Sequence, residues 1–217
     1  MIGLVWKDFL VMRRTMRSYI LFLIFYALLA VMGMFDLAIV TAMIQVIMLM
    51  LPIGAFSYDE HARWDRYAPA LPLSRRQIVG ARYLFTLLLA LVATAFGAAA
   101  GVVLSFTAGP LAMKENLLTV LVSLGAGLFI VDVLLPLCYK LGPERARPYL
   151  YGVVFIPWLL LFGAYKLELI RDFDLTALEQ LSQISTLLLF SLIPLTALAG
   201  LGVSFLISCR IMEKKEY

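Results

Sequence analysis

Residues 84–108, with the sequence LFTLLLALVATAFGAAAGVVLSFTA, contain no charged side chain. About 20 apolar residues in a helix cross the ~30 Å hydrocarbon core of a bilayer, so this run predicts a membrane-spanning helix. The whole chain has the same character, because 63% of its 217 residues are apolar and 15% are charged. In soluble domains about 45–50% of the residues are apolar and about 25% are charged. So few charged side chains cannot cover the surface of a soluble domain of this length.

Six such runs occur along the chain. The expected spans are residues 19–35, 37–57, 84–108, 117–139, 149–165 and 185–208. The first two must be joined by a tight hairpin near residues 33–37, because one helix over both would be about 58 Å long. The sequence therefore predicts an all-α polytopic membrane protein with six transmembrane helices, in a single domain over residues 1–217.

Basic residues predict the orientation. If the amino terminus is cytoplasmic, three basic residues lie outside, namely Lys114, Lys166 and Arg171. The others lie inside: Lys7, Arg13, Arg14, Arg17, Arg63, Arg66, Arg75, Arg76, Arg82, Lys140, Arg145, Arg147, Arg210, Lys214 and Lys215. Short cytoplasmic loops of membrane proteins carry an excess of lysine and arginine. We therefore expect both termini in the cytoplasm and an even number of spans.

Residues 1–18 combine an apolar face with basic side chains. The apolar face consists of Ile2, Val5, Phe9, Met12 and Met16. Lys7 and Arg14 fall on the opposite face, and Trp6 falls at the boundary. This pattern predicts an amphipathic helix that lies in the headgroup layer. The alternative is a basic tail that only fixes the orientation.

The inner loop of residues 58–83, YDEHARWDRYAPALPLSRRQIVGARY, mixes acids, arginines and bulky aromatic residues. Such a loop suits docking to a protein. A short helix over residues 59–67 is expected to end at Ala68 and Pro69. Ser74 and Gln77 have the spacing of a capping box, which predicts the start of the third spanning helix. The alternative is a solvated loop whose arginines merely follow the charge rule.

Two further connections carry structural signals. Gly142 and Pro143 are expected to break the fourth spanning helix. In the outer segment of residues 166–184, Thr176 and Glu179 again have capping-box spacing. Leucines recur there at three-residue steps, at Leu175, Leu178 and Leu181. This segment is expected to form a short outer or re-entrant helix, although the leucines fit plain packing equally well.

The sequence lacks the motifs of most membrane enzymes. His61 is the single histidine, and no glycine is followed by lysine, so neither a histidine-pair metal motif nor a P-loop is present. Cys138 and Cys209 are not spaced as a metal site or a disulfide framework. We predict no catalytic residue, no metal site and no cofactor in this chain, and ATP, if it is consumed, is bound by another protein.

Two polar residues lie within the expected spans. Asp132 lies in the fourth span, where an aspartate costs about 2.5–3.5 kcal/mol and requires a compensating partner. In one interpretation, Asp132 faces a translocation path or an interface between protomers. In the other, it is a protonated or helix-paired acid with a packing role. Gln45 in the second span is a candidate for the same path or, more simply, for an interhelical hydrogen bond.

Several motifs resemble those of the small permease subunits of type-2 ABC transporters. They are WKDFL at residues 6–10, WDRY at 64–67, LPLSRRQIV at 71–79 followed by Arg82 and Tyr83, and PLCYKLGPERAR at 136–147. The resemblance covers essentially the whole chain. It implies a bacterial plasma-membrane exporter in which two permeases, identical or related, work with two separate ATPase subunits that bind ATP and magnesium.

In that family the first inner loop forms the coupling helix, whose counterpart here lies within residues 58–83. The coupling residues implied are Asp59, Glu60, Arg63, Trp64, Asp65, Arg66 and Tyr67. Related subunits export amphipathic or antimicrobial peptides, so a peptide or another hydrophobic cargo is expected. Membrane lipids are the other expected partners, and nucleic acid is not. The alternative function is a non-transporting membrane scaffold that recruits a soluble protein through residues 58–83.

Overall fold

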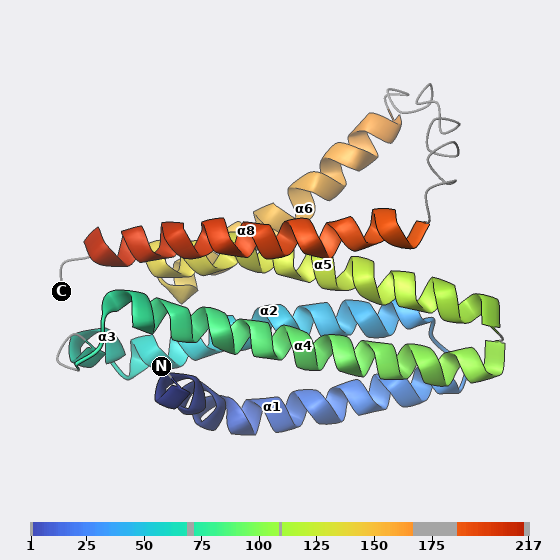
Figure 1. The fold of residues 1–217 in the computed structure, drawn as a ribbon, viewed down its shortest axis with the longest axis horizontal. Coiled ribbons are helices and arrows are strands. Elements are labelled where there is room, and N and C mark those ends of the chain that lie inside the picture. Colours follow the sequence, from blue (N-terminus) through green and yellow to red (C-terminus); the bar gives the residue numbers. More distant parts are fainter. Residues whose placement is uncertain (1, 69–71, 109, 167–185, 215–217) are drawn as a thin grey trace.

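The computed structural model describes residues 2–68, 72–108, 110–166 and 186–214. Within these ranges the chain is helical and contains no strand, which confirms the all-α prediction. The helices are α1 (Ile2–Val31), α2 (Leu37–His61), α3 (Trp64–Tyr67), α4 (Arg75–Ala108), α5 (Pro110–Leu141), α6 (Pro143–Lys166) and α8 (Thr186–Lys214). Figure 1 shows the long helices lying along one another, except for α6, which tilts away from the bundle.

Two glycines allow the chain to reverse direction between helices. Gly33, with φ of 75°, follows α1, and its N–H donates to the carbonyl of Ala30 at 2.9 Å. Gly142, with φ of 82°, follows α5 and precedes Pro143, the first residue of α6. Glycine adopts positive φ without steric cost, and proline suits the first helical position. The predicted hairpin near residues 33–37 and the predicted break at 142–143 are both confirmed.

The largest hydrophobic core lies around α5, which contacts α2, α4, α6 and α8. Its buried members on α5 are Leu128, Val131, Leu134, Leu135 and Cys138. They pack against Val79 and Tyr83 of α4 and against Ala197 and Leu201 of α8. A second core joins α1, α2 and α4 through Val5, Met12, Leu51, Ala55, Ala81, Phe85 and Leu89. A third core joins α1, α2 and α5 through Leu23, Ala30, Leu37, Val40, Ile44 and Val120, so the bundle is packed toward both ends.

Helix α1 differs from the prediction. Residues 2–31 form one continuous helix, without a separate interfacial helix over residues 1–18. The apolar face does exist, but it packs on protein: Met12 is 1% exposed in the second core, whereas Ile2 is 83% exposed. At about 1.5 Å per residue α1 is about 45 Å long, so its first turns extend beyond a ~30 Å hydrocarbon core.

Five of the described helices are long and apolar enough to cross a membrane, namely α1, α2, α4, α5 and α8. Helix α6, over the predicted fifth span at residues 149–165, is not among them. Six spans are therefore not confirmed within the described residues. The structure thus supports a multi-pass membrane protein with five clear spanning helices. The predicted outer helix at residues 166–184 lies outside the described residues, apart from Lys166 at the end of α6.

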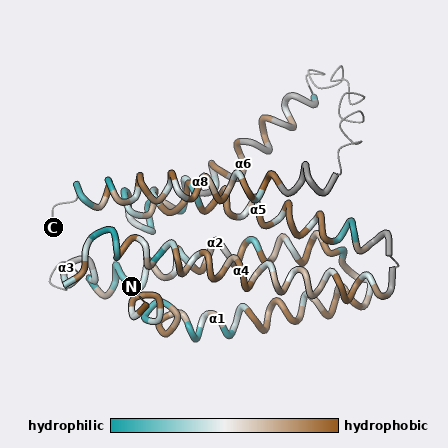
Figure 2. The backbone as a smooth tube through the Cα atoms, viewed as in Figure 1, coloured by the Kyte–Doolittle hydropathy of each residue, from teal (hydrophilic) through white to brown (hydrophobic). Residues whose placement is uncertain are grey.

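Figure 2 shows hydrophilic residues gathered at the end of the bundle that holds α3, the start of α1 and the end of α8. We call this end the polar end. Along the rest of the bundle hydrophobic residues predominate, and many large ones are exposed, such as Phe25, Leu91 and Leu160. A soluble protein rarely exposes so much apolar surface. This surface therefore faces lipid.

Candidate functional site

At the polar end the chain turns sharply after α2, at Arg63 and α3. We call this turn the corner. Helix α2 continues to His61, and the N–H of Ala62 still donates to the carbonyl of Tyr58 at 3.0 Å. Arg63 then adopts the left-handed conformation, with φ of 51° and ψ of 35°, and α3 begins at Trp64. The expected short helix over residues 59–67 is therefore wrong in its start, because Asp59 and Glu60 belong to the last turn of α2.

Helix α4 begins with the predicted capping box. The backbone N–H of Gln77 donates to the Ser74 hydroxyl at 3.2 Å, and the N–H of Ser74 donates to the Gln77 side-chain oxygen at 3.0 Å. Both bonds satisfy N–H groups that a helix start leaves without partners. The guanidinium of Arg75 donates to the carbonyls of Met212 at 3.0 Å and Glu213 at 2.6 Å. The start of α4 is thereby tied to the end of α8.

Four charged side chains from three helices form a buried cluster beside α3. Arg82 of α4 is 6% exposed and pairs with Asp8 of α1 at 3.0 Å and with Asp59 of α2. Lys7 of α1 pairs with Asp59 at 2.7 Å and with Asp8 at 3.4 Å. Two cations and two carboxylates balance one another, as buried charges require. We call these four residues the charge cluster.

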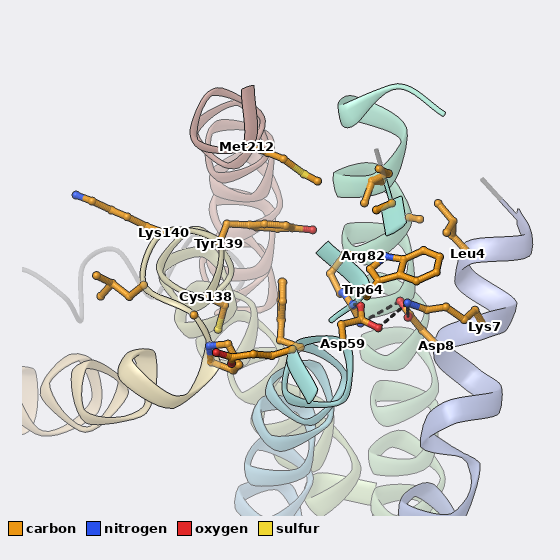
Figure 3. A pocket seen from close by; sticks show the side chains of 18 residues that line it. Leu4, Lys7, Asp8, Asp59, Trp64, Arg82, Cys138, Tyr139, Lys140 and Met212 are labelled. Carbon is orange, nitrogen blue, oxygen red and sulfur yellow. Dashed lines mark hydrogen bonds and ion pairs between the residues drawn. The ribbon is translucent and has the colours of Figure 1, made fainter. Parts of the chain in front are cut away.

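Trp64 is the contact between α3 and the charge cluster. The ammonium group of Lys7 lies 4.2 Å from the centre of the Trp64 ring, within the range of a cation–π interaction. Figure 3 shows the indole beside Lys7, Asp8 and Arg82. Lys7 is thus held between Asp59 and Trp64. The short helix α3 is fixed to α1 through one aromatic side chain.

The predicted coupling residues divide into two groups. Asp59 and Trp64 turn toward the bundle, whereas Glu60, Arg63 and Tyr67 are exposed, Tyr67 by 65%. The backbone of Asp65 and Arg66 lies in α3, but their side chains lie outside the part that the structure describes. The first group can anchor α3, and the second can meet a partner. The structure does not bring all seven residues to one surface.

A cavity of about 230 Å³ opens beside the charge cluster. Residues of α1, α2, α3, α4, α5, α6 and α8 line this cavity, among them Lys7, Glu60, Trp64, Arg82, Tyr139, Lys140 and Met212. Figure 3 shows Trp64 and Lys7 on one side of this cavity and Tyr139 on the other. Within the described residues, no group of three or more histidine, cysteine or acidic side chains is placed to hold a metal. The cavity lies between α3 and the end of α5.

Asp132 lies away from this corner, between α5 and α8. Its Oδ1 is buried without a hydrogen-bond partner, and a Cβ on Gly200 of α8 would overlap its carboxylate. The carbonyl of Asp132 accepts a hydrogen bond from Ser204 at 2.6 Å, and Ser204 contacts the Tyr83 hydroxyl at 2.7 Å. The missing side chain at Gly200 therefore makes room for the carboxylate. The assignment of Asp132 to a translocation path or a protomer interface stays a prediction.

Gln45 joins α2 to α5. Its side-chain N–H₂ donates to the Ser123 hydroxyl at 2.7 Å and to the Ser123 carbonyl, and it lies over Gly127. This is the interhelical hydrogen bond that its position in the second span allows. A role of Gln45 in a translocation path stays a prediction.

Sequence reasoning assigned no site role to Lys7, Asp8 or Arg82. One signal was available, because Asp8 falls three residues after Val5 and four before Met12, on the apolar face. A carboxylate on a buried face requires a cationic partner. The identity of that partner, 74 residues later in Arg82, depends on how α1 and α4 pack and is not encoded in any local spacing.

Comparison with known proteins agrees with this architecture. The family described as "ABC-2 family transporter protein" matches residues 3–213, which is nearly the whole chain. No curated protein and no solved structure matches the chain. The matched residues include all four members of the charge cluster, α3, and α8 as far as Glu213. The chain is therefore a multi-pass membrane protein that belongs to the ABC-2 transporter family.

Proposed function

We propose that this chain is the permease subunit of an ATP-driven exporter and that a separate cytoplasmic ATPase docks at α3. The polar end then faces the cytoplasm, in agreement with the excess of basic residues there. ATP and magnesium are bound by the ATPase, and a second permease, identical or related, completes the transporter in a bacterial plasma membrane. The family assignment supports a transporter component, and the geometry of the corner supports the docking role.

The arrangement of α3 carries this proposal. One side of α3 is anchored through Trp64 to Lys7, and Lys7 pairs with Asp59, which pairs with Arg82. A force on α3 therefore reaches α1, α2 and α4 together. The other side presents Tyr67 and Arg63, an exposed aromatic residue and an exposed cation. Tyrosine and arginine are common among the residues that dominate protein interfaces.

The first test separates docking from transmission in proteoliposomes that contain the permease and its ATPase. We expect Tyr67→Ala to weaken ATPase association by about tenfold, the effect of removing an interface anchor worth ~1.4 kcal/mol. We expect Trp64→Ala to retain association and folding but to lose cargo-stimulated ATP hydrolysis, because α3 loses its contact with α1.

The matched control is Trp6→Ala. Trp6 is 65% exposed, as Tyr67 is, but it lies on α1 and does not line the cavity beside the charge cluster. It should leave both association and hydrolysis unchanged. Wild-type stimulated hydrolysis in the Trp64→Ala protein would contradict transmission through α3. Wild-type association of the Tyr67→Ala protein would contradict docking at this face.

For the cargo, we propose an amphipathic peptide or another hydrophobic molecule. Asp132 is the one acidic residue deep within the described spanning helices, and selective ion pathways usually contain several ionisable groups. Stimulation of ATP hydrolysis can be compared across cationic peptides, lipids and small drugs. Stimulation by small drugs alone would exclude a peptide cargo.

The second candidate function is a membrane scaffold that recruits a soluble protein through residues 58–83. The exposed side chains of the corner would serve this role as well. The two functions differ in the protein that copurifies with the chain. A P-loop ATPase in equal amount supports the transporter, and recovery of the chain without any ATPase supports the scaffold.

A further inference from the structure

A second surface at the polar end is separate from the charge cluster. A groove of about 540 Å³ lies between α1, α2 and α6. We call it the α6 groove. Its lining comprises Met12, Thr15, Tyr19, Met50, Ile53, Gly54, Ser57, Tyr58, His61, Arg147 and Tyr151. Figure 1 shows α6 tilting away from the bundle, so the groove is bordered by a helix that does not pack along its full length.

The polar part of the α6 groove is rich in hydrogen-bond donors and has no acid in its lining. Arg147 lies there, with its second guanidinium nitrogen 3.5 Å from the Ser57 hydroxyl. Tyr58 and His61 follow Ser57 along α2. Arginine, tyrosine, serine and histidine side chains all donate to phosphate oxygens. This composition is complementary to an anion.

Nearby carboxylates are turned elsewhere or exposed. Asp59 pairs with Lys7 and Arg82 on the far side of α2, and Glu60 lines the corner cavity. Glu144 does contact Arg147 at 3.2 Å, but both side chains are about half exposed. An exposed pair of this kind is weak, so it leaves Arg147 free to bind a stronger anionic partner.

The other part of the α6 groove is apolar. Met50, Ile53 and Gly54 continue along α2, away from the polar end, and the Met12 side chain lies against Gly54. Met50 and His61 are eleven residues apart, or about 16 Å along a helix. The groove thus changes from donor-rich to apolar along the direction that leads into the membrane. A phospholipid has the same order of groups, a phosphate followed by acyl chains.

From this match we infer that the α6 groove binds an anionic phospholipid, with the phosphate at Arg147, Ser57 and His61 and an acyl chain along Met50 and Ile53. Anionic lipids are enriched in the cytoplasmic leaflet, which is where the proposed orientation places this end. The inference does not depend on coupling to an ATPase.

The test uses the full-length chain in a mild detergent, with native mass spectrometry after addition of phosphatidylglycerol or phosphatidylcholine with identical acyl chains. We expect the wild-type chain to retain phosphatidylglycerol in preference. Arg147→Gln should lower that retention about tenfold, because it removes a charge-assisted hydrogen bond. It should leave phosphatidylcholine unchanged.

Arg145→Gln is the matched control, since Arg145 is exposed on the same helix but does not line the groove. It should behave as wild type. Met50→Trp fills the apolar part and should lower retention of both lipids, while the thermal midpoint shows that each variant remains folded.

Three results would overturn the inference. The first is equal retention of the two lipids by the wild-type chain. The second is an equal loss of phosphatidylglycerol in the Arg145→Gln and Arg147→Gln proteins, which indicates a diffuse basic surface. The third is binding of inorganic phosphate as tightly as the lipid, which would mean that the apolar part contributes nothing. None of these results would change the measurement of ATPase association, so the two proposals fail independently.

Discussion

Arg82 joins three helices through one guanidinium group. It pairs with Asp8 of α1 and Asp59 of α2, and its guanidinium carbon lies 4.6 Å from the centre of the Phe56 ring. Removal of one member of a buried ion pair leaves an uncompensated charge, which typically costs 3–5 kcal/mol. Arg82 is therefore the residue at which a single substitution should weaken the packing of the polar end most.

We predict that Arg82→Met lowers the stability of the chain by about 3–5 kcal/mol. Thermal unfolding in detergent measures this as a lower midpoint. Arg76→Met is the control, because Arg76 and its partner Glu213 are exposed at 74% and 45%. An exposed pair contributes about 0–1 kcal/mol.

The double variant Arg82→Met with Asp8→Leu tests the cause. The Arg82→Met protein leaves Lys7 as the one cation of the charge cluster for the two carboxylates of Asp8 and Asp59. The second substitution removes the excess carboxylate, so part of the lost stability should return. A double variant as unstable as the sum of both single variants would mean that Arg82 and Asp8 do not depend on each other.

At this scale, sequence reasoning located the corner residues but not their directions. Trp64 and Tyr67 are both among the coupling residues that the resemblance implies, yet the structure turns Trp64 inward and leaves Tyr67 exposed. The chain changes direction at the left-handed Arg63, immediately before α3 begins. A positive φ at an arginine has no signature in residue order, since glycine and asparagine are the usual residues there.

At the scale of helices, the contact between α5 and α8 depends on a glycine. A Cβ on Gly125 would lie 2.6 Å from the Ile193 side chain and 2.9 Å from the backbone nitrogen of Pro194. Backbone atoms cannot move aside as a flexible side chain can. Close approach of this kind is what small residues provide in membrane helices.

We predict that Gly125→Ala destabilises the chain by about 1–3 kcal/mol, the usual cost of forcing extra volume into a packed contact. Gly202→Ala on α8 is the control, because nothing lies within 4 Å of a Cβ placed there. Alanine is the better helix former, so the control should be neutral or stabilised by up to about 1 kcal/mol. Equal thermal unfolding midpoints for the two variants would show that the close contact at Gly125 does not affect stability.

Helix starts and ends were predictable where side chains mark them. The Ser74 and Gln77 capping box and the turns at Gly33 and Gly142 all carry local signals. The continuity of α1 carries none, since an amphipathic face looks the same whether it packs on lipid headgroups or on α2 and α4. Only the tertiary partners Leu51 and Phe85 distinguish the two cases.

At the scale of the molecule, the path of α6 decides the topology. Five of the described helices have the length and hydropathy of a span, yet Figure 1 places the start of α1 and the end of α8 at the same end of the bundle. An odd number of crossings would put these ends on opposite sides of a membrane. Helix α6, about 36 Å long at 1.5 Å per residue, has the length for a sixth crossing.

We predict that α6 crosses the membrane, so that Arg63 and Lys214 face the cytoplasm and Met34 and Met113 face outside. Single cysteines at these four positions can be labelled from one side with a membrane-impermeant thiol reagent. The background is Cys138→Ala with Cys209→Ala, since both native thiols are buried. Labelling of positions 63 and 214 from opposite sides would show that α6 does not cross.

The left-handed conformation of Arg63 has a thermodynamic consequence for the corner. A non-glycine residue in this region carries strain of about 1–2 kcal/mol, which the contacts of α3 must offset. Glycine would relieve this strain in the folded chain but would leave more backbone freedom between α2 and α3. Arginine at position 63 therefore gives the turn a more defined angle than glycine would, at a cost in stability.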